Sequence, residues 1–190
     1  MWSSSTFVAQ MEIEMSKKFW LMKSEPNVYS IDDLKSEKRT LWDGVRNYQA
    51  RNYMMNEMSQ GDVVFFYHSN TDPSGLAGIA KVSSSKAVAD PTQFDKRSDY
   101  YDEAATKEKP RWFCVEISYQ AKFETFVPLA QLKEDPRFKE LPLTQRGSRL
   151  SVQPVPDKLA ELLLDMGHGA SSATSLKQKR KSKLSETLRG

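Results

Sequence analysis

The chain is poor in the residues that build metal centres and disulfides. It contains one cysteine, Cys114, and two histidines, His68 and His168, among 190 residues. One thiol excludes an intrachain disulfide and a zinc site of several thiolates. Two histidines are too few for most histidine-based metal or proton-relay sites. We therefore expect a protein without metal or cofactor, stabilised by its own core in a reducing compartment.

Long hydrophobic runs and enzyme signatures are also absent. No apolar run approaches the roughly 18 residues that a transmembrane helix needs. The first charges, Glu12 and Glu14, are acidic, which is unlike a secretory signal. The sequence holds no glycine-rich phosphate loop, no G-x-S-x-G elbow and no paired-histidine motif. We expect a monomer with no membrane partner and no catalytic residues.

Basic charge is confined to one end of the chain. The formal net charge is +3, yet residues 170–190 hold six Lys and Arg side chains against Glu186 alone. The rest of the chain is therefore slightly acidic, which excludes a uniformly basic domain that coats nucleic acid. Three interpretations of the basic end stay open: a solvated tail, a non-specific phosphate-binding segment, or a nuclear import signal.

Composition divides the chain into three parts. Residues 1–16 are Ser-rich and weakly patterned, which predicts a disordered extension. Residues 18–166 carry the hydrophobic patterning of one folded domain. Residues 167–190 are rich in Ser, Lys and Gly and predict a basic disordered tail.

Patterning within 18–166 predicts an α+β domain. Apolar runs and alternation predict strands at 19–22, 63–67, 78–88, 111–123 and 150–155. Caps and 3.6-residue spacing predict short helices near 30–34, 47–58, 128–132 and 159–166, the last followed by Gly167 as its C′ residue. About five or six strands between short helices favour a curved or barrel-like sheet. Cys114 is expected to be buried in its strand, and the polar stretch 90–110 to form a covering loop.

The segment 41–53 is the most unusual in the chain, because it combines three aromatic side chains, two arginines and several amides. Asp43-Gly44 predicts a tight turn that presents Trp42 at the end of a strand. Asn47 has a structural alternative as the N-cap of the following helix. The functional hypothesis is recognition of a planar heterocycle, since stacking of a base on an aromatic side chain contributes roughly 1–3 kcal/mol. Polar groups beside it would match the edge of the base.

Four blocks of the sequence resemble the EVE domain family. They are Trp20–Pro26, Trp42–Asn52, Phe66–Asn70 and Ser148–Val155, and shorter matches occur at Asp90–Asp95, Tyr100–Asp102 and Pro110–Trp112. The blocks occur in order between residues 18 and 166. The resemblance implies a PUA-like pseudo-barrel of about five or six strands with short flanking helices, related to the YTH and ASCH modules.

The resemblance also implies a cleft that recognises a modified base in DNA or RNA. The base would be flipped out of its strand and left chemically unchanged. Opposite walls of the cleft would be formed by two sets of residues: Lys23, Ser24 and Glu25 on one side, Arg149 and Ser151 on the other. The floor would hold Trp42, Arg46, Asn47 and Tyr48, and the rim Tyr67, His68 and Ser69.

A nuclease or base-processing hydrolase related to ASCH-type domains is the main alternative hypothesis, and a small-molecule or protein-interaction domain that uses the same cleft is a third. The acid–base candidates of the hydrolase would be His68, Lys23, Glu25 and Asp43. Against it, no nucleophile–base pair is spaced convincingly in the sequence. For each of these functions we expect a cytoplasmic protein if the source is bacterial and a nuclear one if it is eukaryotic.

Overall fold

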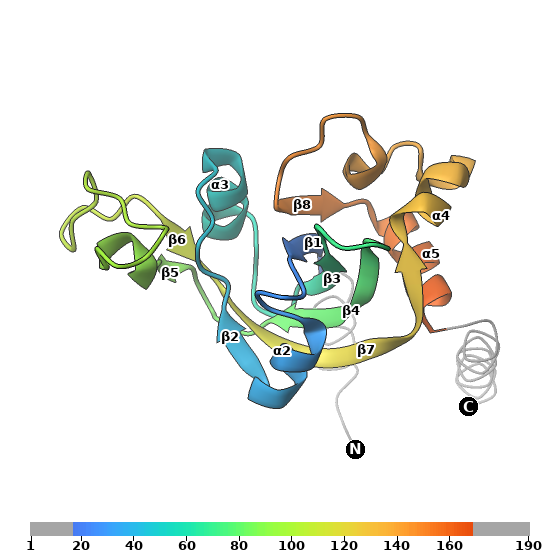
Figure 1. The fold of residues 1–190 in the computed structure, drawn as a ribbon, viewed down its shortest axis with the longest axis horizontal. Coiled ribbons are helices and arrows are strands. Elements are labelled where there is room, and N and C mark those ends of the chain that lie inside the picture. Colours follow the sequence, from blue (N-terminus) through green and yellow to red (C-terminus); the bar gives the residue numbers. More distant parts are fainter. Residues whose placement is uncertain (1–16, 169–190) are drawn as a thin grey trace, which may run out of the picture.

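The computed structural model describes residues 17–168, and a curled six-stranded sheet runs through its centre (Figure 1). The strands lie in the order β2-β7-β4-β3-β1-β8. Their bounds are Arg39–Leu41 (β2), Glu116–Pro128 (β7), Gly75–Val82 (β4), Val63–His68 (β3), Phe19–Ser24 (β1) and Val152–Val155 (β8). β1 pairs in parallel with β3, and the other neighbours are antiparallel. The predicted α+β class with a curved, barrel-like sheet is confirmed.

Four α-helices of the described part cover the sheet, near the predicted positions. They are α2 (Ile31–Glu37), α3 (Tyr48–Asn56), α4 (Leu129–Glu134) and α5 (Asp157–Gly167). The predicted capping box of α2 is present. Ser30 Oγ accepts the N–H of Asp33 at 3.1 Å, and the Asp33 carboxylate accepts the N–H of Ser30 at 2.8 Å. Asn47 caps α3, as the structural alternative for this residue predicted.

Both faces of the sheet are buried, which explains the uninterrupted apolar runs in β1 and β3. Trp20 and Met22 of β1 pack on one face, and Leu21 packs on the other. In β3, Phe66 and Phe65 divide between the faces in the same way. Successive strand side chains point to opposite faces, so the domain has two cores. One core includes buried residues of α2 and α3, and the other includes buried residues of α4 and α5.

The predicted role of Gly167 is wrong. Gly167 is the last residue of α5, and His168 closes the helix with an ordinary right-handed backbone (φ −83°). A Cβ at position 167 would lie 2.5 Å from the ring of Phe123 in β7. Glycine is therefore required here for close packing of the helix on the sheet and not for a left-handed turn.

Two of the predicted strands are interrupted. The strand predicted at 78–88 consists of β4, which begins earlier at Gly75, and the separate β5 (Val88–Ala89). The strand predicted at 111–123 divides at Val115 into β6 (Phe113–Cys114), which pairs with β5, and β7, which pairs with β2 and β4. β5 and β6 pair in a small sheet of their own, which anchors the 90–110 loop at the side of the domain (Figure 1).

Cys114 is fully buried in β6, as predicted, and burial raises the pKa of its thiol to about 12. Between residues 17 and 168, no helix is long and apolar enough to cross a membrane. The predicted extension at 1–16 and nearly all of the predicted basic tail lie outside the described residues.

Candidate nucleic-acid interface

A cleft of about 620 Å³ opens beside the ends of β1 and β3. Its other sides are the turn after β2 and the segment that leads into β8. Eight of the twelve residues expected at a base-binding site line this cleft: Lys23, Ser24, Glu25, Trp42, Arg46, Ser69, Arg149 and Ser151. Blocks far apart in the sequence meet here because β1 lies between β3 and β8. The volume is typical of a cleft that takes one small ligand or group.

The turn after β2 forms the floor of the cleft. Gly44 has φ +74°, a conformation that favours glycine, and its N–H donates to Asp90 Oδ2 at 2.9 Å. Trp42 is 7% exposed and packs edge-on against Phe66, with ring centroids 5.4 Å apart. The indole N–H of Trp42 has no acceptor within the described residues. In the same residues, every fully buried polar side-chain atom has a hydrogen-bond partner, so an unpartnered N–H is not fully buried. This N–H therefore reaches solvent and is available as a donor.

Arg46 is fixed by contacts on several sides. Its Nη1 donates to Asp90 Oδ2 at 2.8 Å, its Nη2 to Thr92 Oγ1 at 2.8 Å, and its Nε to the carbonyl of Tyr100 at 2.8 Å. Burial alone would raise the pKa of Asp90, but the hydrogen bonds from Arg46, Thr92 and Gly44 outweigh it and lower the pKa below its ordinary value. Charged Asp90 thus ties the floor of the cleft to the 90–110 loop.

Lys23 joins the end of β1 to the segment before β8. Its backbone N–H donates to the carbonyl of Ser151 at 2.9 Å, and its Nζ donates to the carbonyl of Ser148 at 3.4 Å. Burial lowers the pKa of the Lys23 amine. Nearby, one carboxylate oxygen of Glu25 accepts a hydrogen bond from the Asn70 amide at 2.6 Å. The walls of the cleft are therefore linked by hydrogen bonds through both backbone and side chains.

Tyr29, Asp43 and Tyr100 also line the cleft, although they were not among the predicted pocket residues. The ring of Tyr100 covers Gly44, where a Cβ would lie 2.8 Å from a ring carbon, and is 44% exposed. Burial, and then the charge of Asp90, raise the pKa of Asp43. Tyr100 belongs to one of the shorter matching blocks, so that block was the signal available in the sequence.

Asn47 and Tyr48 lie outside the cleft. The side-chain oxygen of Asn47 accepts the N–H groups of Gln49 and Ala50, so it is used by the N-cap of α3. The ring of Tyr48 stacks on Trp112 with centroids 4.9 Å apart, the Arg51 guanidinium lies 4.7 Å from its centre, and its hydroxyl accepts a hydrogen bond from Arg111. Tyr48 therefore joins α3 to the segment before β6.

Tyr67 and His68 also lie outside the cleft, and on opposite faces of β3. Tyr67 is buried in the same core as Leu21 and lines a second hollow. His68 accepts the N–H of Ile31, the first residue of α2, through Nε2 at 3.2 Å. This bond uses the neutral imidazole, since a protonated ring has no acceptor.

His68 should make stability depend on pH in the mildly acidic range. Burial lowers the pKa of His68 from 6.5, Asp32 raises it and Lys122 lowers it further. Because the folded pKa lies below the unfolded one, the stabilising contribution is full above pH 6.5 and is lost as the pH falls below that value. As the pH falls below 6.5, the free energy of unfolding should fall more for the native protein than for His68→Gln. Urea denaturation across this range measures the difference, and parallel curves would contradict it.

Residues 18–166 match the sequence model of the EVE domain. Thymocyte nuclear protein 1 of Danio rerio is 40% identical over 165 residues, which make up 77% of this chain and 71% of that protein. A solved protein of Pseudomonas syringae is 46% identical and superimposes with a TM-score of 0.72, covering 76% of this chain and 97% of its own. Human THYN1, solved in complex with 5-methylcytosine-containing DNA, is 37% identical with a TM-score of 0.74, covering 80% and 99%.

Proposed function

The chain belongs to the EVE domain family, and from this premise we propose that it binds DNA carrying a modified base, which enters the cleft and is not chemically altered. The observation that carries the proposal is the likeness to human THYN1, which was solved with 5-methylcytosine-containing DNA and whose solved chain is covered to 99%. The cleft supports it, because aromatic rings and hydrogen-bonding groups converge there from separate parts of the sequence.

The cleft offers two kinds of contact to a flipped base. Tyr29, Trp42 and Tyr100 supply apolar aromatic surface, which compensates the few kcal/mol that flipping costs. For the edge of the base, the indole N–H of Trp42 is a donor and the Asp43 carboxylate is an acceptor. A carboxylate is a suitable partner for the amino group of a cytosine. We infer that a cytosine-type edge fits this donor and acceptor set.

Tyr100 and its neighbour Tyr101 give a matched test. Both side chains are exposed, at 44% and 37%, but only Tyr100 lines the cleft. Tyr100→Ala keeps the backbone carbonyl that holds Arg46 and should weaken binding to an oligonucleotide with one 5-methylcytosine by roughly 5- to 150-fold, since one stacked base contributes 1–3 kcal/mol. Tyr101→Ala should leave the affinity unchanged. Fluorescence polarisation with methylated and unmethylated strands measures both.

Two outcomes would oppose the proposal. Equal affinity of the native protein for methylated and unmethylated DNA would contradict recognition of the modified base. An equal loss of affinity in Tyr100→Ala and Tyr101→Ala would contradict the cleft as the site where the base binds. Mass spectrometry of the recovered DNA tests the hydrolase alternative, for which Lys23, Glu25 and Asp43 line the cleft whereas His68 does not. RNA binding, the monomeric state and a nuclear or cytoplasmic location stay predictions, and RNA strands in the same binding assay test the first of them.

A further inference from the structure

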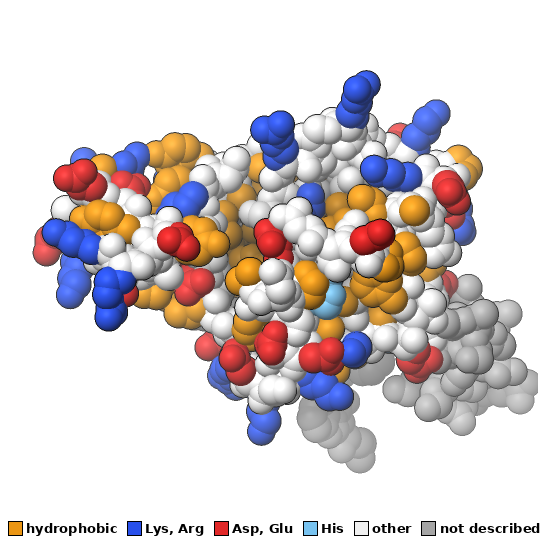
Figure 2. Space-filling view, viewed as in Figure 1, with side chains coloured by type: hydrophobic (Ala, Val, Ile, Leu, Met, Phe, Trp, Pro, Cys, Tyr) orange, Lys and Arg blue, Asp and Glu red, His pale blue; other side chains and the backbone are white. Residues whose placement is uncertain are grey.

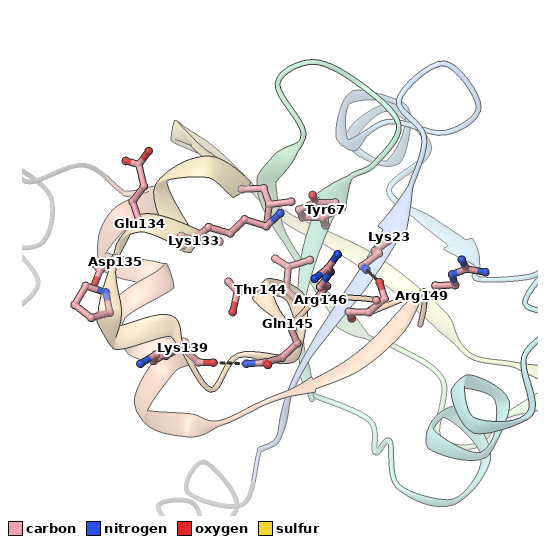
Figure 3. Close-up of a pocket in the computed structure, with 16 residues that line it drawn as sticks. Lys23, Tyr67, Lys133, Glu134, Asp135, Lys139, Thr144, Gln145, Arg146 and Arg149 are labelled. Atoms are coloured by element: carbon pink, nitrogen blue, oxygen red, sulfur yellow. Dashed lines mark hydrogen bonds between the residues drawn. The ribbon is translucent and has the colours of Figure 1, made fainter.

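A second hollow, of about 850 Å³, adjoins the cleft. Lys23 and Arg149 line both spaces, so the two meet at these side chains. The second hollow is bounded by α4, the segment between α4 and β8, and Tyr67 of β3 (Figure 3). We call it the basic groove, because Lys and Arg side chains line it.

Positive charge gathers in the basic groove, although the described body carries as many acidic as basic side chains. Five cationic residues line it: Lys23, Lys133, Lys139, Arg146 and Arg149. The acidic lining residues are Glu134 and Asp135, and Asp135 pairs with Arg137 at 2.6 Å. Figure 2 shows Lys and Arg side chains projecting from the edge that α4 and the segment before β8 form. Within residues 17–168, none of the five cations forms an ion pair.

The side of the groove formed by the chain between α4 and β8 is held in a fixed shape. Buried side chains anchor this segment to the core: Phe138, Leu141 and Leu143. Thr144 Oγ1 lies within hydrogen-bond distance of the carbonyls of Phe138 and Leu141, at 2.8 and 2.9 Å. The Gln145 amide donates to the carbonyl of Lys139 (Figure 3). The basic side chains therefore extend from a rigid support, which lowers the entropic cost of binding.

Lys23 lies where a negative ligand group would be most stabilising. Its amine is partly withdrawn from water, and no carboxylate of the described residues pairs with it. Its neighbours are the Ser148 carbonyl at 3.4 Å and the Tyr67 ring, whose centre is 5.9 Å away. A buried charge without a counter-charge costs free energy, and a phosphate at this position would offset that cost.

We propose that the basic groove binds the phosphate backbone of the same DNA strand whose modified base enters the cleft, with Lys23 and Arg149 holding the phosphate at the junction. The inference rests on the proposed function for the identity of the strand. Phosphate contacts fix the position of a strand, and base contacts select the sequence. The groove thus supplies affinity and orientation, and the cleft supplies the preference for the modified base.

The double variant Lys133→Ala with Arg146→Ala tests the groove, because both residues line it and neither lines the cleft. Lys35→Ala with Lys86→Ala is the matched control, since it removes the same charge from exposed positions outside both hollows. The slope of log affinity against log salt should decrease in magnitude by about 1.8 on duplex DNA or about 1.4 on single strands in the groove variant. The control should show a smaller change, and the preference for 5-methylcytosine should stay the same in both.

The two proposals fail in different ways in this experiment. A groove variant whose salt slope equals that of the control overturns the groove, whatever the base preference. A native protein without base preference overturns the proposed function, while the slopes on unmethylated DNA still test phosphate binding. Short single strands with the modified base at the 5′ end, at the centre or at the 3′ end show on which side of that base the backbone enters the basic groove. One of the two terminal strands should bind the native protein and the groove variant equally, and a difference on both would contradict a single backbone path.

Discussion

Replacing Trp42 by alanine should lower the free energy of unfolding by about 3 to 5 kcal/mol, the range for large aromatic side chains removed from a core. The sequence suggested that Trp42 is presented for stacking at the end of a strand, and in the structure this side chain is only 7% exposed and packs against Phe66. Loss of DNA binding in Trp42→Ala would therefore report unfolding as well as recognition. Urea denaturation measures the effect, and a loss below about 1 kcal/mol would show that the site collapses around the smaller side chain.

Trp42→Phe separates the two roles of this residue. Phenylalanine keeps an aromatic ring in the core and removes the indole N–H, which has no acceptor among the described residues. The stability loss should be clearly smaller than in Trp42→Ala, because less volume is removed. Any loss of affinity for methylated DNA by the folded variant then measures the donor at the edge of the base. An unchanged affinity would assign edge recognition to other groups of the cleft.

Asp90→Ala should destabilise the protein by about 3 kcal/mol, because it leaves a mostly buried guanidinium without its counter-charge. The side chains of Asp90 and Arg46 are 1% and 21% exposed. The same substitution removes the acceptor of the Gly44 and Thr92 backbone N–H groups. The turn that forms the cleft floor should therefore lose its attachment to the 90–110 loop. Thermal and urea denaturation measure the loss. Retention of native stability would mean that water replaces the carboxylate fully.

The conservative variant Asp90→Asn adds a pH test of the same contact. The folded pKa of Asp90 lies below its ordinary value of 3.8, so the stabilising contribution is present above that pH and is lost as the pH falls below it. The difference in unfolding free energy between native protein and Asp90→Asn should be constant near neutral pH and shrink below about pH 4. A difference that instead vanished between pH 8 and 6 would assign the effect to another group.

Local sequence patterns predicted most of the fold, because they depend on neighbouring residues. The capping box at Ser30, the turn at Gly44 and the apolar runs of β1 and β3 all follow from short-range spacing. The interruption of the strand at Val115 could not be predicted this way, since it depends on which other strands pair with its two halves. The prediction of Gly167 as a C′ residue was wrong for the same reason, because its close contact is with Phe123 on another element.

Eight of the twelve residues predicted from the resemblance line one cleft, and the positions of the other four have physical explanations. Adjacent strand residues face opposite sides of a sheet, so the sequence alone could have placed Tyr67 on the face opposite to Phe66. Asn47 had the cap as a stated alternative. Tyr100 could not be placed by pattern, because the 90–110 loop has no periodicity and its position depends on Arg46 and Gly44.

Cys114 makes the opening of the small sheet measurable. It is the single cysteine of the chain, it is fully buried in β6, and a thiol with a pKa of about 12 does not react while it stays there. A thiol reagent can therefore label the native protein only during transient local unfolding. β5 and β6 anchor the loop that carries Tyr100 over the cleft. The labelling rate therefore measures how often the small sheet opens and releases this loop from the cleft. A ligand that bridges Tyr100 and Trp42 would slow the labelling in proportion to its occupancy, so one thiol reports both local stability and binding.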